Sequence, residues 1–181
     1  MEKKAVVLYW SRTGNTKKVA HSIEEGLKDA GVDVSLKTID EAEELDYFDY
    51  DLVCVGFPSY EWHTPKPVSD YLKKHLNVHR RQGKVKLGSP KIPGKHVLIF
   101  CTYSGPHTGM DEATPAGDYV GQFFDHIGFN ILDKWYVLSE FIGNEAASTN
   151  GRMGDIRGLP TEDELDDIKE KAGKLSDKLI G

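Results

Sequence analysis

The sequence has 181 residues, of which 39% are hydrophobic, and its 23 basic and 29 acidic side chains give a formal net charge of −6. A chain of this length and composition can bury one sizeable core, so we expect a single domain spanning residues 1–181. No apolar run is long enough to cross a bilayer, and the N-terminus leads directly into a strand-like run. We therefore expect a cytoplasmic protein without a membrane span or a secretory signal peptide.

The positions of the cysteines and of the charged residues argue against a metal site and against nucleic-acid binding. Cys54 and Cys101 lie far apart within apolar runs, so we interpret them as buried, reduced side chains and expect no metal site. Eight Lys or Arg residues and no Asp or Glu lie between Tyr71 and Met110. No nucleic-acid recognition motif accompanies this basic window (73–95), so we interpret it as a solvated or partner-binding surface and expect no nucleic-acid ligand.

The first half of the chain alternates between strand and helix patterns. Residues 5–10 (AVVLYW) are continuously apolar, which is typical of a strand covered on both faces. From 16 to 30 the apolar residues recur at helical spacing, and Gly31 ends the predicted helix. Residues 32–36 alternate between apolar and polar, as in a half-exposed edge strand. A second apolar run, 52–57 (LVCVGF), predicts another central strand.

The second half of the chain continues this alternation. Its predicted elements are, in order, a helix at 67–76, an aperiodic connection at 77–94, a central strand at 97–101, a helix at 115–127 and an edge strand at 131–138. Thr161 and Glu164 then have the spacing of a capping box at the start of a final amphipathic helix.

Five alternations of strand and helix predict an α/β fold, with a five-stranded parallel sheet and helices on both faces. Because the second and fifth strands have the edge pattern, we expect the strand order 2-1-3-4-5. In such sheets, ligands bind beyond the C-terminal strand ends where the strand order reverses, which here is between the first and third strands. The loop Ser11–Thr16, which follows the first strand, is therefore at the expected ligand site.

The loop Ser11–Thr16 (SRTGNT) offers hydroxyl, amide and backbone N–H donors and contains no Cys, carboxylate or His. The first N–H groups of a helix have no intrahelical partner, the helix dipole adds partial positive charge, and Gly14 allows a tight backbone turn. This chemistry favours a phosphate dianion. Arg12 either reaches the phosphate or lies at the rim, and an ordinary capped turn is the alternative for the whole loop.

The stretch VLYWSRTGNTKKVAHSI resembles the phosphate-binding signature of flavodoxins, in which a hydrophobic strand and an aromatic residue precede Ser/Thr-x-Thr-Gly-Asn-Thr and a helix. The resemblance implies a flavodoxin-like three-layer sandwich that binds FMN, and the alternation of elements extends it over nearly the whole chain. The residues that it implies around the 5′-phosphate are Ser11, Arg12, Thr13, Gly14, Asn15 and Thr16.

Two further loops are expected to meet the isoalloxazine ring of FMN. A flavin needs a flat slot with aromatic faces, together with donors and acceptors for its polar edge. Tyr60, Trp62 and Tyr103 are the candidates for stacking on the ring, with core packing as the alternative. The loop residues expected at the ring are Pro58, Ser59, Tyr60, Glu61 and Trp62 after the third strand and Thr102, Tyr103, Ser104, Gly105 and His107 after the fourth.

Two functions fit these features: an FMN-binding electron-transfer protein and an FMN-dependent NAD(P)H oxidoreductase acting on quinones or similar acceptors. Flavodoxins typically have a Gly in the loop after the third strand, whereas this sequence has none between Phe57 and Thr64. His63 and His107 fit the enzyme, because histidines beside a flavin can donate protons; the alternative for each is a loop histidine bonded to backbone or solvent. We expect a redox partner protein or a small-molecule electron donor or acceptor, and a homo-oligomer stays open.

The segment 139–160 is long for a connection and rich in Gly and Asn. Such segments are usually functional or mobile, and this one follows the last strand at the same edge as the predicted flavin. We expect it to cover the flavin or to reach the flavin of a neighbouring subunit, with Arg152 and Arg157 as candidates to attract a nucleotide phosphate. A disordered linker is the alternative.

Overall fold

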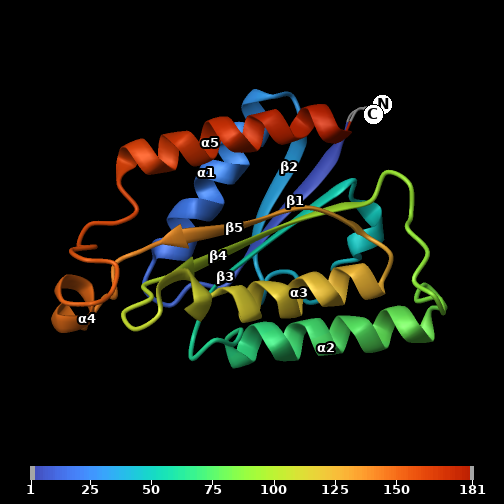
Figure 1. Cartoon of the computed structure of the whole chain (residues 1–181). Coiled ribbons are helices and arrows are strands. Elements are labelled where there is room, and N and C mark those ends of the chain that lie inside the picture. The colour runs from blue at the N-terminus through green and yellow to red at the C-terminus, as the bar shows by residue number, and fades with distance from the viewer. Residues whose placement is uncertain (1–2, 180–181) are drawn as a thin grey trace.

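The strands form one parallel five-stranded sheet in the order β2-β1-β3-β4-β5 (Figure 1). This arrangement comes from a computed structural model that describes residues 3–179. The predicted parallel sheet and its strand order are confirmed. The strands are β1 (Lys4–Tyr9), β2 (Asp33–Thr38), β3 (Leu52–Pro58), β4 (His96–Tyr103) and β5 (Asn130–Leu138).

Helices cover both faces of the sheet (Figure 1). One face packs against α1 (Asn15–Asp29) and α5 (Glu162–Leu175), and the other packs against α2 (Lys66–Arg81) and α3 (Thr114–His126). No helix within residues 3–179 is both long enough and apolar enough to cross a membrane. The short elements are α4 (Glu145–Thr149) and the 3-10 segments η1 (Tyr47–Asp49), η2 (Gly109–Glu112) and η3 (Ser176–Leu179).

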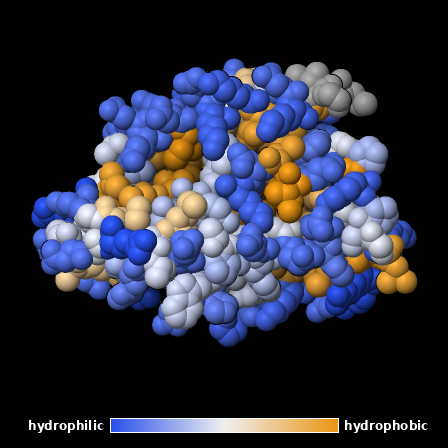
Figure 2. All heavy atoms as spheres, in the orientation of Figure 1, coloured by the Kyte–Doolittle hydropathy of each residue, from blue (hydrophilic) through white to orange (hydrophobic). Residues whose placement is uncertain are grey.

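The core has two halves, one on each side of the sheet. Successive residues of the central strands point to opposite faces, so Val6 joins the half under α2 and α3 while Val7 joins the half under α1 and α5. Both valines are fully buried, as expected for a continuous apolar run. Cys54 and Cys101 are free and buried, and burial raises the pKa of each thiol. The surface in Figure 2 is mainly hydrophilic, with hydrophobic atoms in small areas.

The basic window (73–95) begins on α2 and continues into the connection that follows it. This connection lies at the opposite end of the molecule from α4 and the C-terminal strand ends (Figure 1). The predicted helix end at residue 76 was wrong, because α2 continues to Arg81. The extension buries His79, a polar residue that the apolar periodicity did not count.

The capping box at α5 is confirmed. The Glu164 N–H donates to the Thr161 hydroxyl at 3.3 Å, and the Thr161 N–H donates to the Glu164 carboxylate at 2.8 Å. Two of the N-terminal donors that α5 cannot satisfy internally are satisfied in this way.

Helices α1 and α5 approach so closely that their backbones meet. A Cβ added to Gly26 of α1 would lie 2.0 Å from the carbonyl oxygen of Lys169 in α5. A Cβ added to Gly173 of α5 would lie 3.2 Å from the carbonyl oxygen of Gly26, which a small shift can relieve. The contact therefore depends on Gly26 far more than on Gly173.

We expect Gly26→Ala to lower the free energy of unfolding by about 2 kcal/mol, because the backbone of α5 must move to admit one methyl group. Chemical denaturation followed by circular dichroism measures the change. Gly173→Ala is the matched control and should be near neutral or stabilising, since Ala favours a helix interior by about 1 kcal/mol. Equal losses in both variants would contradict this account of the helix contact.

A buried aromatic cluster joins His75 and His79 of α2 to Tyr47 of η1. The Tyr47 ring centroid lies 4.9 Å from that of His75 and 5.4 Å from that of His79. Within residues 3–179, neither the ring nitrogens of the two histidines nor the Tyr47 hydroxyl have a hydrogen-bond partner. Burial lowers the pKa of His75 to about 4 and also lowers that of His79, so both are neutral near pH 7.

The free energy of unfolding should fall as the pH drops from about 6.5 toward about 4, because the unfolded histidines take up protons in this range and the buried His75 does not. The slope from each histidine is no more than about 1.4 kcal/mol per pH unit. Denaturant titrations at pH 7, 6 and 5 measure it. His75→Leu should flatten the slope, and an unaltered slope in this variant would contradict the assignment.

Candidate functional site

The loop between β1 and α1 lies at the C-terminal edge of the sheet. Its start is fixed by the Trp10 N–H, which donates to the Gly56 carbonyl at 3.0 Å. Gly14 precedes α1 with a φ of 105°, a conformation that strains residues with a Cβ. The Gly14 N–H donates to the Ser11 hydroxyl at 3.1 Å, which closes the loop on itself.

The concave side of this loop presents backbone donors. The Lys18 N–H bonds to the Gly14 carbonyl, but the N–H groups of Asn15, Thr16 and Lys17 find no acceptor within the part of the chain that the structure describes. Three adjacent unpaired donors at a helix N-terminus suit an anion. A pocket of about 440 Å³ opens here, lined by Tyr9, Trp10, Ser11, Arg12, Thr13, Gly14, Lys17, Thr38 and Asp40.

Five lining residues of this pocket are absent from the set predicted from the sequence: Tyr9, Trp10, Lys17, Thr38 and Asp40. Thr38 and Asp40 come from the end of β2, which pairs with β1 so that Tyr9 lies opposite Thr38. The predicted strand order could have identified Thr38 and Asp40 as neighbours of the loop, because it places β2 beside β1.

Two side chains of the loop already have partners in the protein. The hydroxyls of Thr16 and Thr102 lie 2.8 Å apart and are buried, which ties α1 to the end of β4. The Asn15 side chain donates through Nδ2 to the Glu140 carbonyl at 3.0 Å. Asn15 and Thr16 do not line the pocket, and what they leave unpaired at the start of α1 is their backbone N–H groups. The side chains of Arg12 and Thr13 are exposed.

The loop after β3 forms a tight turn without glycine. Tyr60 and His63 exchange two backbone hydrogen bonds of 3.0 and 2.9 Å, and the residues between them, Glu61 and Trp62, have φ values of 48° and 67°. Positive φ at both central positions is the pattern of a type I′ turn. Such a conformation costs of order 1–3 kcal/mol for each residue with a side chain, so the surrounding structure must hold it.

This turn holds two aromatic side chains out of the core. Trp62 is 56% exposed and Tyr60 is 39% exposed, so the alternative of core packing does not apply to them. Tyr60 makes an edge-on contact with Trp10, with ring centroids 6.0 Å apart, which links the turn to the phosphate loop. Pro58 ends β3, and the Ser59 hydroxyl donates to the Glu112 carbonyl.

The loop after β4 is held mainly by its own polar groups. The Ser104 hydroxyl donates to the Ser139 carbonyl at 2.8 Å, and the Glu112 carboxylate accepts the His107 N–H at 2.7 Å. Gly105 has a φ of 54° and packs against the backbone of Gly109. The hydroxyls of Ser59, Thr102 and Ser104 all have protein partners. Backbone groups are therefore better candidates than these three hydroxyls to bond a ligand.

Tyr103 lies in the core rather than at the surface. Its side chain is 8% exposed and belongs to the hydrophobic cluster under α2 and α3, and burial raises the pKa of its hydroxyl. The structure thus brings Tyr60 and Trp62 to the exposed edge and gives Tyr103 the packing role that was the alternative. As the last residue of β4, Tyr103 retains the alternating orientation of the strand.

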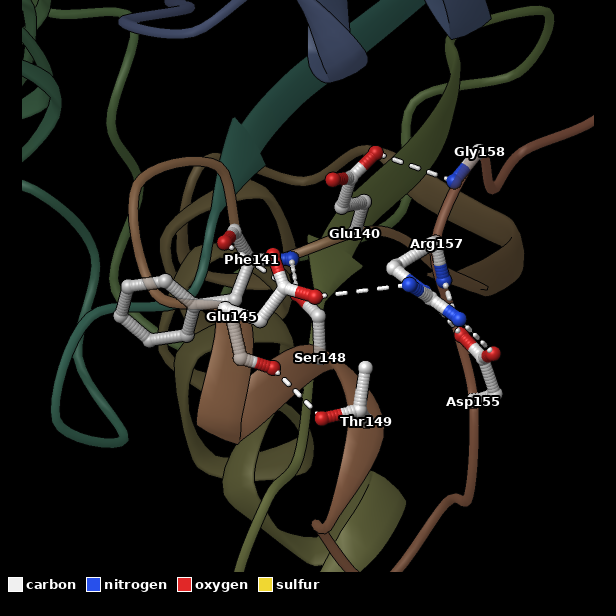
Figure 3. Close-up of polar contacts among 8 residues, drawn as sticks. All are labelled: Glu140, Phe141, Glu145, Ser148, Thr149, Asp155, Arg157 and Gly158. Atoms are coloured by element: carbon white, nitrogen blue, oxygen red, sulfur yellow. Dashed lines mark hydrogen bonds and ion pairs between the residues drawn. The ribbon is translucent and has the colours of Figure 1, made fainter.

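The segment 139–160 is folded, and the alternative of a disordered linker was wrong. It contains α4, capped by the Asn144 side chain, and buries Ile156. Arg157 pairs with Asp155 at 2.6 Å and with Glu145 at 3.4 Å (Figure 3), and the first pair lowers the pKa of Asp155 to about 2. Arg157 is thus engaged within its own segment.

The same segment packs on the loop after β4. The Arg152 N–H donates to the Pro106 carbonyl at 2.8 Å, and the Arg152 side chain lies beside Gly109.

Within residues 3–179 no group of three or more His, Cys, Asp or Glu side chains is arranged to hold a metal ion.

Comparison with known proteins gives one family. The family model described as a flavodoxin domain matches residues 6–105. A flavodoxin of Megasphaera elsdenii is 36% identical over 97 residues, which are 54% of this chain and 63% of that protein. A flavodoxin of Aquifex aeolicus is 44% identical over 57 residues, or 31% of each chain. The aligned regions thus span less than two thirds of either curated relative.

Solved structures show the same fold. Flavodoxin 1 of Bacillus cereus has a TM-score of 0.67 at 15% identity, over 97% of this chain and 98% of that one. A flavodoxin of Streptococcus pneumonia TIGR4 has a TM-score of 0.66 at 19% identity, over 97% of this chain and 99% of that one. The similarity extends beyond the region that the family model matches.

We expect Gly14→Ala to lower FMN affinity about fivefold, because a Cβ at a φ of 105° costs about 1 kcal/mol and the loop relaxes away from its anion-binding shape. Fluorescence quenching of FMN measures the affinity. Gly31→Ala is the matched control, since Gly31 has a φ of 81° and, like Gly14, has open space around an added Cβ. Both variants should lose similar stability, and an equal loss of FMN affinity in Gly31→Ala would contradict a local role for Gly14.

Proposed function

This chain belongs to the flavodoxin family, and from that premise we propose that it binds FMN and transfers electrons through it. The observation that carries the proposal is the loop Ser11–Thr16, where Gly14 and the unpaired first N–H groups of α1 form an anion-binding concavity. When FMN is bound, its ring supplies the redox chemistry, and the protein supplies binding, orientation and electrostatics.

The donor chemistry of this loop fits the phosphate of FMN. The N–H groups of Asn15, Thr16 and Lys17 are neutral donors, and Arg12 and Lys17 contribute positive charge at the rim. Hydrogen bonds to a charged group are stronger than those to a neutral one, so a dianion gains most from this arrangement. The loop has no group that would exchange a proton with the phosphate.

The exposed aromatics support a ring site beside the phosphate loop. Tyr60 and Trp62 present apolar faces to solvent, which a flat ligand would cover with a gain from apolar burial. Two backbone hydrogen bonds hold the turn, so the backbone that carries both aromatic side chains is fixed before the ligand arrives. We assign the polar edge of the ring to backbone groups of the loops after β3 and β4.

We further propose a cytoplasmic location and a redox partner protein or small-molecule donor or acceptor. The two buried cysteines are unpaired, as is usual for a protein of a reducing compartment. A homo-oligomer is compatible with this proposal.

One observation favours the NAD(P)H oxidoreductase as a second candidate. His63 Nδ1 lies 2.6 Å from the Glu61 carbonyl oxygen, so this nitrogen carries a hydrogen and Nε2 of the exposed ring is left to face a ligand. A histidine fixed in one tautomer beside the aromatic turn can exchange a proton with a bound quinone or similar acceptor.

The purified protein should take up FMN and become yellow, and it should bind FMN at least about 100-fold more tightly than riboflavin. The phosphate gains two or more charge-assisted hydrogen bonds, worth together about 3 kcal/mol. Absorbance and fluorescence titrations with both flavins measure the difference. A protein that stays colourless and binds no added FMN would overturn the proposal.

Anaerobic titration with NADH and NADPH separates the two candidates. A carrier should keep its flavin absorbance in the presence of either nucleotide and lose it only with a chemical reductant. Rapid bleaching by a nucleotide, slowed in His63→Gln, would favour the oxidoreductase instead.

A further inference from the structure

The phosphate loop is tied to a segment that lies 125 residues away in sequence. Asn15, the first residue of α1, is 7% exposed, and its Nδ2 donates to the Glu140 carbonyl at 3.0 Å. A buried amide held in this way fixes the side-chain torsions of Asn15, and with them the orientation of the first turn of α1.

Glu140 also closes the segment that follows it. Its N–H donates to the Leu159 carbonyl at 3.0 Å, and its carboxylate accepts the Gly158 N–H at 3.0 Å (Figure 3). Residues 140–159 therefore form a loop whose two ends meet at Glu140, and we refer to these residues as the clamp.

Hydrogen bonds within the clamp hold its fold and so fix the position of Glu140. The Phe141 N–H donates to the buried Ser148 hydroxyl at 3.1 Å, and the Ile156 N–H donates to the Ser148 carbonyl at 2.8 Å. Figure 3 shows Arg157 between Asp155 and Glu145, joining the two sides of the clamp. The clamp also reaches the loop after β4 through the Arg152 N–H and the Pro106 carbonyl.

We propose that Asn15 and Glu140 are positioning residues for the phosphate of the ligand. The clamp holds Asn15 through Glu140 and so fixes the N–H groups of Asn15, Thr16 and Lys17 before FMN arrives. Fixing donors in their bound orientation lowers the entropy cost of binding. Asn15 thus acts on the phosphate through the backbone N–H groups that it orients, while its side-chain amide bonds to Glu140. This inference rests on the proposed binding of FMN.

Four variants and two ligands test the proposal. The variants are Asn15→Ala, Glu140→Ala, the double variant of both, and Asn130→Ala, which removes an amide that donates to backbone carbonyls at the start of β5, outside the clamp. The readouts are the dissociation constants of FMN and of riboflavin, which lacks the phosphate, together with thermal unfolding of each variant without ligand.

We expect Asn15→Ala and Glu140→Ala each to weaken FMN binding about fivefold, the effect of one hydrogen bond, and to leave riboflavin binding unchanged. Asn15→Ala removes the link to the Glu140 carbonyl, whereas Glu140→Ala keeps that carbonyl and removes the carboxylate that holds the Gly158 N–H. The double variant should be no weaker than Asn15→Ala alone, because the Glu140 side chain acts on α1 only through the Asn15 amide. Asn130→Ala should bind FMN as the wild type does.

Two results would overturn the positioning role. Independent losses that multiply to about 25-fold in the double variant would show that Asn15 and Glu140 act separately. Equal losses for FMN and riboflavin would show general destabilisation. If the unmodified protein binds no FMN, the proposed function fails; if it binds FMN and the single variants match it, only the clamp inference fails.

Discussion

The pairing of β1 with β2 on one side and β3 on the other is the constraint on which the site depends. Both pairings are parallel, and they bring Tyr9 opposite Thr38 and Gly56. Three strand ends therefore meet at one edge, and the chain must leave β1 through a turn that enters α1 directly. Because α1 begins directly after this turn, the N–H groups of its first turn have no partner within the helix. Gly14 allows the connection between β1 and α1 to be short.

Much of the fold follows from local patterns in the sequence. Strands β1, β3 and β4 are continuous apolar runs because helices cover them on both faces. The polar residues within β2 and β5 follow from the edge positions of these two strands. Strand order could be inferred because these two patterns differ. The capping box at Thr161 was equally local, since both of its hydrogen bonds lie within one turn.

Features that depend on contacts distant in sequence were not predicted. The end of α2 was misplaced because His79 is buried among aromatic rings that come from other elements, and its polar identity hid that role. The phosphate loop was recognised from its own residues, but the partners of its Asn15 and Thr16 side chains lie 125 and 86 positions away. Neither hydrophobic periodicity nor motif spacing predicts hydrogen bonds between residues so far apart in sequence. The fold of residues 139–160 was missed for the same reason, since it is held by specific side-chain bonds rather than by an apolar pattern.

The packing of α1 also has a consequence for biosynthesis. The phosphate loop is made early, but α1 rests on α5 through Gly26 and Lys169, and its first residue is held by Glu140. A nascent chain that ends before Glu140 lacks both supports, however completely β1 and α1 have been synthesised. Because a domain folds as a unit once its interacting parts are present, the loop acquires its final shape only when the last helix has been made. Loading of a cofactor therefore has to follow the synthesis of α5.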